Sequence, residues 1–428
     1  MSKIPSLPAA TPGTPPAPTA ALPATLWSGG FGHFLVNLGA ATLAIQIQNT
    51  IVGYQMYQLT GDPLALGMVG LAEAVPFISL VLFGGHVADR VDRRRVSLLA
   101  YAVMIAAAVS LFVLSHNAAA LGPHNVKLAV FALIVTNGVC RSFIQPARTA
   151  LSAQLAPRLH QARAVAWRTG IFQLCAVTGP AAGGLVYGWW GADGGYAAAA
   201  ALLIVAWLVL FRLRMPAPAV LNTRPAIWAS LAEGIKYLRS DNLLRAAILL
   251  DLFAVLFGGA VALLPAFAND ILQVGAKGFG LLRAAPAAGA LAASAALALL
   301  PPLRRAGMAL LIAVAGFGVC MIGFALSRSF VLSLGLLAAS GAFDMVSILV
   351  RSTLLQLRVP QEMMGRVAAI NQVFVGSSNE VGAFESGLAA RLIGVTTSVL
   401  AGGVVTLGVV AFSAVRSKEL RELGSLTS

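Results

Sequence analysis

Charged residues are scarce in this chain, and acidic residues are the scarcest of them. Only 15 of the 428 residues are Asp or Glu, and charged residues make up 10% of the total, whereas soluble domains contain about 25%. Hydrophobic residues account for 58%. A soluble protein must cover its surface with polar side chains, and this composition does not supply them. The shortage of charge therefore excludes an ordinary soluble protein and indicates one embedded in a membrane.

Cysteine is also rare, and its placement excludes further classes of protein. The three cysteines, Cys140, Cys175 and Cys320, lie singly and far apart in apolar segments, so they predict neither a disulfide framework nor a metal site. The sequence has no histidine pair, Ser/His/Asp set or phosphate-binding glycine loop in a suitable setting. We therefore expect no enzymatic activity, no catalytic residues, no metal and no cofactor, and an ATP-driven pump is disfavoured.

Long apolar runs are abundant. About 20 residues of helix are needed to cross about 30 Å of hydrocarbon, and the sequence contains twelve runs of roughly that length. They cover residues 30–57, 64–87, 96–115, 126–147, 165–189, 195–212, 243–266, 279–300, 307–326, 330–350, 367–390 and 394–415. The pattern predicts an all-α membrane protein with twelve transmembrane helices.

Basic residues are distributed unevenly between these runs. The net charge of +14 would by itself suggest a nucleic-acid partner. The bases fall almost entirely in every second connection: Arg90, Arg93, Arg94 and Arg95; Arg148, Arg158 and Arg163; Arg212, Arg214, Arg224, Lys236, Arg239 and Arg245; Arg304 and Arg305; Arg351, Arg358 and Arg366; Arg416, Lys418 and Arg421. The opposite connections contain only Lys127, Lys277, Arg283, Arg328 and Arg391. By the positive-inside rule both termini are cytoplasmic, and since the charge reflects topology, no nucleic-acid partner is expected.

Two breaks divide the chain. Residues 1–25 are rich in proline and lack the apolar core of a signal peptide, so we expect a disordered cytoplasmic tail. The remaining divisions are a first half at 26–213, a cytoplasmic linker with an amphipathic helix at 214–241, a second half at 242–416 and a cytoplasmic tail at 417–428. A shift of 203 residues places Arg148 on Arg351 and Gly179 on Gly382. Such a parallel repeat predicts two pseudo-symmetric six-helix halves.

A dense charge cluster separates the second and third apolar runs. Residues 85–94 read GHVADRVDRR and match the pattern G-x-L-A-D-R-x-G-R-R except at Val87 and Asp92. The segment resembles the signature turn of the major facilitator superfamily, and the resemblance implies a membrane transporter with the fold of that superfamily.

The resemblance also implies that this turn is a conformational latch. We predict that Asp89 faces the N-terminus of the run beginning near Arg366, where unpaired N–H groups attract an anion, and so closes the cytoplasmic side. The alternative is a cluster that only sets topology, which needs the arginines but not the acid. The predicted latch consists of Gly85, Asp89, Arg90, Arg93, Arg94 and Arg366.

A glycine-rich motif lies in the fifth apolar run. Gly179, Pro180, Gly183 and Gly184 resemble the G-P-x-x-G-G core found in the fifth helix of antiporters of this superfamily, although Cys175 stands where that motif has a further glycine. Small residues at this spacing let a neighbouring helix come close, and the proline kinks the helix. Ordinary tight packing is an equal alternative to a role in antiport, and the motif favours export.

Shorter fragments resemble one branch of the superfamily. The segments 44–48, 264–268 and 364–367, together with Arg95 and Val96 after the signature turn, are similar to the enterobactin-exporter and macrolide-efflux branch. The resemblance implies a bacterial inner-membrane protein that exports a small amphipathic molecule, of siderophore or drug type, in exchange for protons. We expect a monomer whose partners are the substrate, protons and the lipid bilayer. An uptake or facilitated-diffusion permease and a non-transporting scaffold or sensor stay open as alternatives.

Polar side chains inside the apolar runs are the candidates for mechanism. Each costs about 2.5–3.5 kcal/mol to insert, so it needs a partner or a watery cavity. The candidates are Glu73, Arg141, Asp344, Glu380, Glu385, Gln46, Gln48 and Asn49. For Glu73, and also for Asp251, a structural ion pair is an equal alternative.

The repeat suggests which of these candidates act together. The shift of 203 residues places Arg141 on Asp344. We hypothesise that Asp344 exchanges the coupled proton, while Arg141 anchors an anionic group of the substrate or tunes Asp344. The alternative is a structural pair of Asp344 with Arg351, which we expect at the cytoplasmic interface. Glu380 is the competing proton site.

Overall fold

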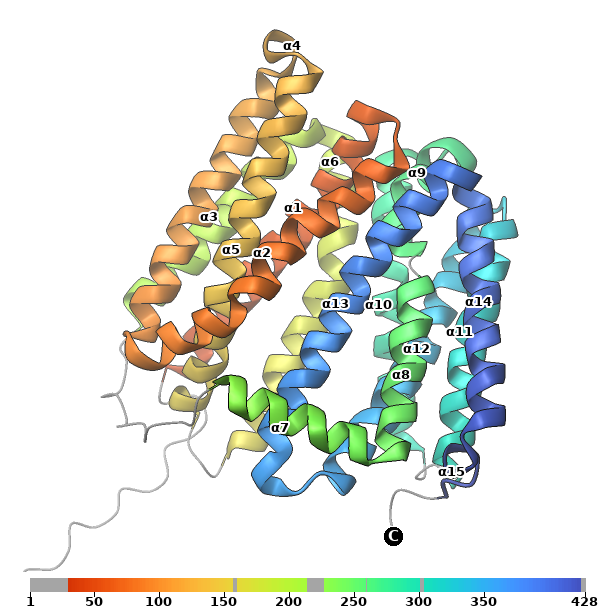
Figure 1. Ribbon diagram of the computed structural model, residues 1–428. Coiled ribbons are helices and arrows are strands. Elements are labelled where there is room, and N and C mark those ends of the chain that lie inside the picture. Colours follow the sequence, from red (N-terminus) through yellow and green to blue (C-terminus); the bar gives the residue numbers. More distant parts are fainter. Residues whose placement is uncertain (1–29, 157–159, 214–226, 259, 301–303, 425–428) are drawn as a thin grey trace, which may run out of the picture.

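The computed structural model describes residues 30–156, 160–213, 227–258, 260–300 and 304–424, and within these ranges all regular structure is helical (Figure 1). The tail predicted for residues 1–25 and the first part of the predicted linker, 214–226, lie outside the described residues. The side chain of Asp89 lies outside them as well, although its backbone belongs to a helix.

The first half of the chain forms one group of packed helices. They are α1 (Phe31–Thr60), α2 (Pro63–Arg90), α3 (Arg93–His116), the short α4 (Ala118–Leu121), α5 (Pro123–Leu155) and α6 (Gln161–Arg212). Helix α1 packs on α6, α2 packs on α5, and α3 packs on both α5 and α6. Their core contains the buried side chains of Phe34, Tyr101 and Met104.

The second half forms another group with its own core. Its elements are α8 (Asn242–Phe257), η2 (Ala260–Leu263), α9 (Leu264–Ala266), η3 (Phe267–Ile271), α10 (Gly275–Leu299), α11 (Ala306–Leu326), α12 (Phe330–Arg358), α13 (Gln361–Ile393), α14 (Val395–Arg416) and α15 (Lys418–Arg421). Phe267, Phe279 and Phe324 are buried in one of its clusters. Helix α7 (Ile227–Ser240) precedes this half and lies across the lower end of the bundle in Figure 1. The amphipathic helix predicted in the linker therefore matches α7 in position.

Ten stretches of the described chain are long and apolar enough to cross a membrane, judged by length and composition. One of them, in α6, covers two predicted spans that meet at Gly191, whose φ of 66° and ψ of −165° interrupt the helix. Helix α13 coincides with the predicted span 367–390 but is not among the ten, and it carries Arg366, Glu380, Glu385 and Arg391. The membrane-spanning, all-helical class is confirmed, and the count of twelve stays a prediction.

The seventh apolar run differs from the single helix that we expected. Helix α8 ends at Gly258, and the chain continues through a 3-10 turn, one short α turn and a π turn. Glycine favours the end of a helix, and Pro265 has no N–H to donate. In the π turn the amide of Leu272 donates to the carbonyl of Phe267, five residues earlier, at 2.8 Å, whereas in an α-helix it would donate to the carbonyl four residues earlier. Hydropathy does not detect the start of this break because residues 258–268 are apolar throughout.

The two halves converge at one end of the bundle. We call the end that carries the α2–α3 turn, α7 and α15 the basic end (Figure 1). At the opposite end a Cβ added to Gly67 of α2 would lie 2.8 Å from the Cα of Phe384 in α13. A Cβ on Gly184 of α6 would lie 2.6 Å from the Cα of Gly280 in α10. Glycine is therefore needed where the backbones of the halves touch.

Candidate transport site

An arginine of α5 forms an ion pair with an acid of α2 inside the first half. Arg141 donates to Glu73, and the two side chains are 30% and 12% exposed. The helices approach closely at Gly138, where a Cβ would lie 2.8 Å from the Cγ of Pro76. The guanidinium of Arg141 also lies 5.4 Å from the centre of the Phe77 ring. A shielded pair of this kind is stronger than one on a surface, because little water competes for it.

An acid of the second half comes close to this pair. A Cβ on Gly70 of α2 would lie 3.0 Å from Oε2 of Glu380 in α13. Gly70 precedes Glu73 by three residues, which is about one turn on the same side of a helix. Glu380 is accordingly within electrostatic range of both Glu73 and Arg141. The interface between the halves therefore carries carboxylates from both sides.

A second arginine completes the charge cluster. We expected Arg283 in a connection, but it lies two turns inside α10 and is partly buried. It is within electrostatic range of Glu73 and Glu380. Among the described residues no ion pair within 4.0 Å is found for it. Its position inside the run 279–300, which we had predicted as a span, could have indicated that Arg283 lies within a helix and not in a connection. We call Glu73, Arg141, Arg283 and Glu380 the central charge cluster.

A different ion pair lies wholly within the second half. Nη2 of Arg351 in α12 is 2.8 Å from Oδ1 of Asp251 in α8, and the side chains are 7% and 4% exposed. Ser347 donates to the same carboxylate at 3.4 Å. Arg351 was expected at the cytoplasmic interface; its side chain is buried here, two turns before the end of α12 at Arg358, and its depth in the membrane stays a prediction. Its partner is Asp251, so the alternative pair with Asp344 is absent from this structure.

Asp344 lies apart from the central charge cluster. It lines a small cavity within the second half together with Asp251, Phe317 and Phe343. Within the part of the chain that the structure describes, no salt bridge involves Asp344. The two residues related by the 203-residue shift are therefore not brought together, since Arg141 binds Glu73 in the other half.

Two of the predicted latch residues, Arg94 and Arg366, make contacts that were not predicted. Arg94 donates to the carbonyls of Leu210, at 3.1 Å, and Phe211, which ties the α2–α3 turn to the end of α6 in the same half. Asp92, which departs from the signature pattern, accepts from the amide of Arg94 at 2.9 Å and caps α3. Arg366 pairs with Glu233 of α7. The contact of Asp89 with the start of α13 stays a prediction, because that side chain is not described.

The glycine motif of α6 packs against both halves. A Cβ on Gly183 would lie 3.2 Å from the carbonyl oxygen of Ile47 in α1, and Gly179 lies against Gln46 of the same helix. Gly184 instead faces α10, as described above. The tight packing considered for this motif is present, and it includes the contact between the halves.

Three further candidate residues show no contact that assigns them a role. Gln48 is buried, Asn49 is partly buried, and Glu385 accepts a hydrogen bond from Ser386 at 3.5 Å.

Comparison with known proteins identifies the family. The family model described as Major Facilitator Superfamily matches residues 31–383. The chain belongs to this superfamily. Enterobactin exporter EntS of Escherichia coli O127:H6 is 28% identical over 380 residues, which cover 88% of this chain and 87% of the relative. The protein of the same name from Salmonella typhi is 28% identical over 379 residues, 87% of each chain.

Solved structures of the superfamily fold agree with this assignment. A POT family transporter has a TM-score of 0.72 at 12% identity, covering 92% of this chain and 97% of that one. A bacterial homologue of the human lysosomal transporter Spinster, in an inward-facing and unoccupied conformation, has a TM-score of 0.65 at 14% identity and covers 92% and 98%. The predicted family and fold class are confirmed, and the protein is a multi-pass membrane transporter.

Proposed function

We propose that this protein is a proton-driven exporter of an enterobactin-like siderophore across the bacterial inner membrane. The similarity to enterobactin exporters supports the substrate class, because it extends over 88% of the chain. The distribution of arginines supports an orientation with the basic end and both termini in the cytoplasm. The proposed unit is a monomer, and its further partners are the substrate, protons and lipid.

The arrangement of the halves supports the direction of transport. In the proposed orientation the contacts at Gly67 and Gly184 lie at the periplasmic end, so this state faces inward. An exporter loads its substrate in such a state. Trp167, Ile171 and Leu174 of α6 line an open hollow toward the basic end, and these side chains supply apolar surface for an amphipathic substrate.

One observation carries the proposal of proton coupling: Glu380 of the second half lies one turn from the Glu73–Arg141 pair of the first half. Opening the periplasmic end requires α2 and α13 to separate, which moves Glu380 away from Arg141. In a low-dielectric environment a carboxylate needs a cationic partner, water or a proton. Glu380 then takes up a proton from the periplasm, returns neutral, and releases the proton when the inward-facing cluster forms again.

Asp344 fits this role less well. Its charged neighbours, Asp251 and Arg351, both belong to its own half. A movement of one half against the other leaves these neighbours in place, so it does not change the partners of Asp344. The proposed proton site is therefore Glu380, and Arg283 is free to bind an anionic group of the substrate.

The test uses inverted membrane vesicles, in which the cytoplasmic face is outside and substrate is pumped into the lumen. An acidic lumen is expected to drive uptake of enterobactin, and a protonophore should abolish it. Glu380→Gln should lose gradient-driven uptake but keep substrate counterflow. Glu385→Gln, on the same helix and beside Ser386, is the matched control and should keep both.

Each contrary result has a distinct meaning. Uptake that equilibrates without regard to the gradient identifies a facilitated-diffusion permease. No movement of enterobactin in either direction rejects the substrate class. Full gradient-driven uptake by Glu380→Gln removes Glu380 from the mechanism and returns the assignment to Asp344.

A further inference from the structure

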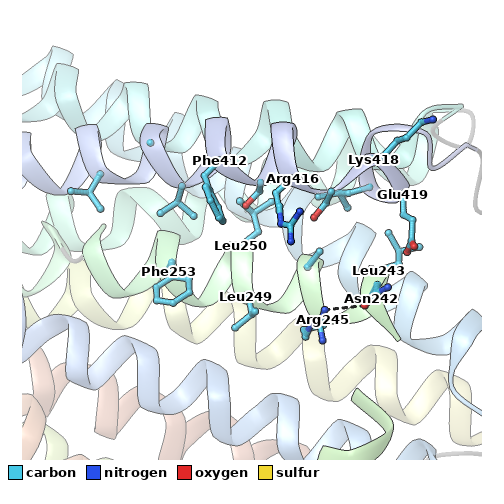
Figure 2. A pocket seen from close by; sticks show the side chains of 17 residues that line it. Asn242, Leu243, Arg245, Leu249, Leu250, Phe253, Phe412, Arg416, Lys418 and Glu419 are labelled. Carbon is cyan, nitrogen blue, oxygen red and sulfur yellow. Dashed lines mark hydrogen bonds between the residues drawn. The ribbon is translucent and has the colours of Figure 1, made fainter. Parts of the chain in front are cut away.

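A groove of about 790 Å³ lies between α8, α14 and the short C-terminal helix α15 (Figure 2). This volume falls within the range of about 300–1,000 Å³ that small-molecule sites occupy. Leu249 and Phe253 line it from α8, and Val405 and Phe412 line it from α14. The groove is separate from the central charge cluster, since all of its lining residues belong to the second half.

The packing of the two long helices explains why the groove forms. Helices α8 and α14 are in close contact near Gly402, where a Cβ would collide with the carbonyl of Phe257. Thr406 also approaches the carbonyl of Ala254, at 3.5 Å. The groove begins where these contacts end, and it runs to the basic end of the bundle. There α15 closes it, because Leu420 is fully buried and its backbone lies against Gly307 of α11.

The basic end of the groove carries three cations from three different elements. Arg245 lies in the first turn of α8, Arg416 lies in the last turn of α14, and Lys418 begins α15. Figure 2 shows Phe412 and Arg416 on the α14 side of the groove, facing the α8 side chains across it. Glu419 is the one acid among the lining residues.

The charges of this rim are only partly compensated. Arg245 donates to neutral oxygens, those of Asn242 at 2.9 Å and of the Arg239 carbonyl at 3.2 Å. Lys418 forms an exposed pair with Glu422 at 3.7 Å, and such pairs contribute little. Arg416 has no hydrogen bond or ion pair within the described residues. A cationic rim above an apolar groove is complementary to a phosphate with an attached acyl chain.

The geometry points to a binding site for one anionic phospholipid of the cytoplasmic leaflet. Arg245, Arg416 and Lys418 hold its phosphate, and one acyl chain lies along Phe253 and Phe412. The assignment to this leaflet rests on the proposed orientation of the protein. Basic pockets between transmembrane helices on the cytoplasmic side bind anionic headgroups, with each cation contributing about 1 kcal/mol. A zwitterionic lipid has the same chains but no net charge, so the site should discriminate against it.

Native mass spectrometry of the full-length protein in detergent tests the headgroup. The probes are phosphatidylglycerol and phosphatidylethanolamine with identical chains. The wild type should bind phosphatidylglycerol more tightly, and Arg245→Gln/Arg416→Gln should weaken that binding about 30-fold, the factor for two surface cations. Arg304→Gln/Arg305→Gln removes an equal charge from the same end outside the groove, and it should leave binding unchanged.

A second pair of variants tests the acyl chain. Gly408 lines the groove, and a Cβ there would meet nothing within 4 Å, so Gly408→Leu adds an apolar side chain to the groove from an open position. Gly335 of α12 is equally open but lies elsewhere, which makes Gly335→Leu the control. Gly408→Leu should lose the bound lipid, and Gly335→Leu should keep it.

Two outcomes overturn the site: equal affinity for the two lipids, or equal loss in the variants and their controls. Displacement of phosphatidylglycerol by glycerol 3-phosphate would reject the acyl-chain part, because a free headgroup would then suffice. The assay measures binding without transport, so failure of the proposed export function leaves this result intact, and failure here leaves export untouched.

Discussion

Replacing Asp251 by asparagine would leave the Arg351 guanidinium buried without a counter-ion. The side chains are nearly the same size, so the change removes charge and creates almost no cavity. Arg351 is only 7% exposed, so bulk water has little access to replace the carboxylate. Nε of Arg351 already has no partner among the described residues. The other acid nearby, Asp344, lies in electrostatic range of Arg351 but forms no salt bridge with it, so the paired carboxylate of Asp251 has no direct replacement in this structure.

Breaking a buried ion pair by removing one partner costs about 3–5 kcal/mol. For Asp251→Asn we expect the free energy of unfolding to fall by about 3 kcal/mol, the lower end of this range, since the asparagine oxygen keeps a weak hydrogen bond with Arg351. The double variant Asp251→Leu/Arg351→Met should recover most of this loss, because an apolar pair of similar volume carries no uncompensated charge. The exposed pair Lys418–Glu422 is the control, with side chains 76% and 66% exposed, and Glu422→Gln should cost about 0.5 kcal/mol or less.

The assay is reversible unfolding of the purified protein in mixed micelles, with a titration of dodecyl sulfate and tryptophan fluorescence as the readout. Two results would refute the reasoning. A single variant as stable as the wild type would mean that water or another group reaches Arg351. A double variant as unstable as the single one would mean that the loss comes from altered packing and not from the unpaired charge.

Three further predictions concern conformation and topology. Gly184→Leu should force α6 away from α10 and raise the outward-open population, which cysteine labelling from the periplasm measures. Gly170→Leu, on the same helix, places its Cβ in open space and should leave the labelling unchanged. Unchanged labelling in both variants would contradict the contact between α6 and α10. Asp89→Asn should destabilise the outward-open state by about 1 kcal/mol, or about 2 kcal/mol if the site is partly buried. The variant should be expressed normally and show greater accessibility from the cytoplasm. Transport and accessibility equal to those of the wild type would refute the latch hypothesis. A reporter inserted near Ala219 should be cytoplasmic and one near His124 external, and an external signal from the first would overturn the two-halves interpretation.

The amino-acid sequence by itself determined the membrane class, the family and the approximate helix positions. In hydrocarbon every backbone N–H and C=O needs a partner within the protein, and a helix is the structure that supplies all of them within one apolar run of about 20 residues. The turn at 85–94 was recognisable because its charges cannot lie in lipid. These properties depend on residues that are neighbours in the chain.

The irregular parts of the helices were harder to predict. The break at Gly258 and Pro265 is hidden because the residues around it are as apolar as those of a regular helix. The depth of Arg283 was misjudged because an arginine near the end of an apolar run was taken as a connection residue. In both cases hydropathy alone does not report where the helix begins or bends.

Only the tertiary structure decided which charges meet. The repeat relates Arg141 to Asp344 because they occupy equivalent positions in two halves, but equivalent positions do not touch. Arg141 meets Glu73 because Gly138 lets α5 approach α2, and Glu380 reaches the same place because Gly70 leaves room for it. Partner choice in a helical bundle depends on which helices pack and where small residues let them come close, and neither follows from spacing along one chain.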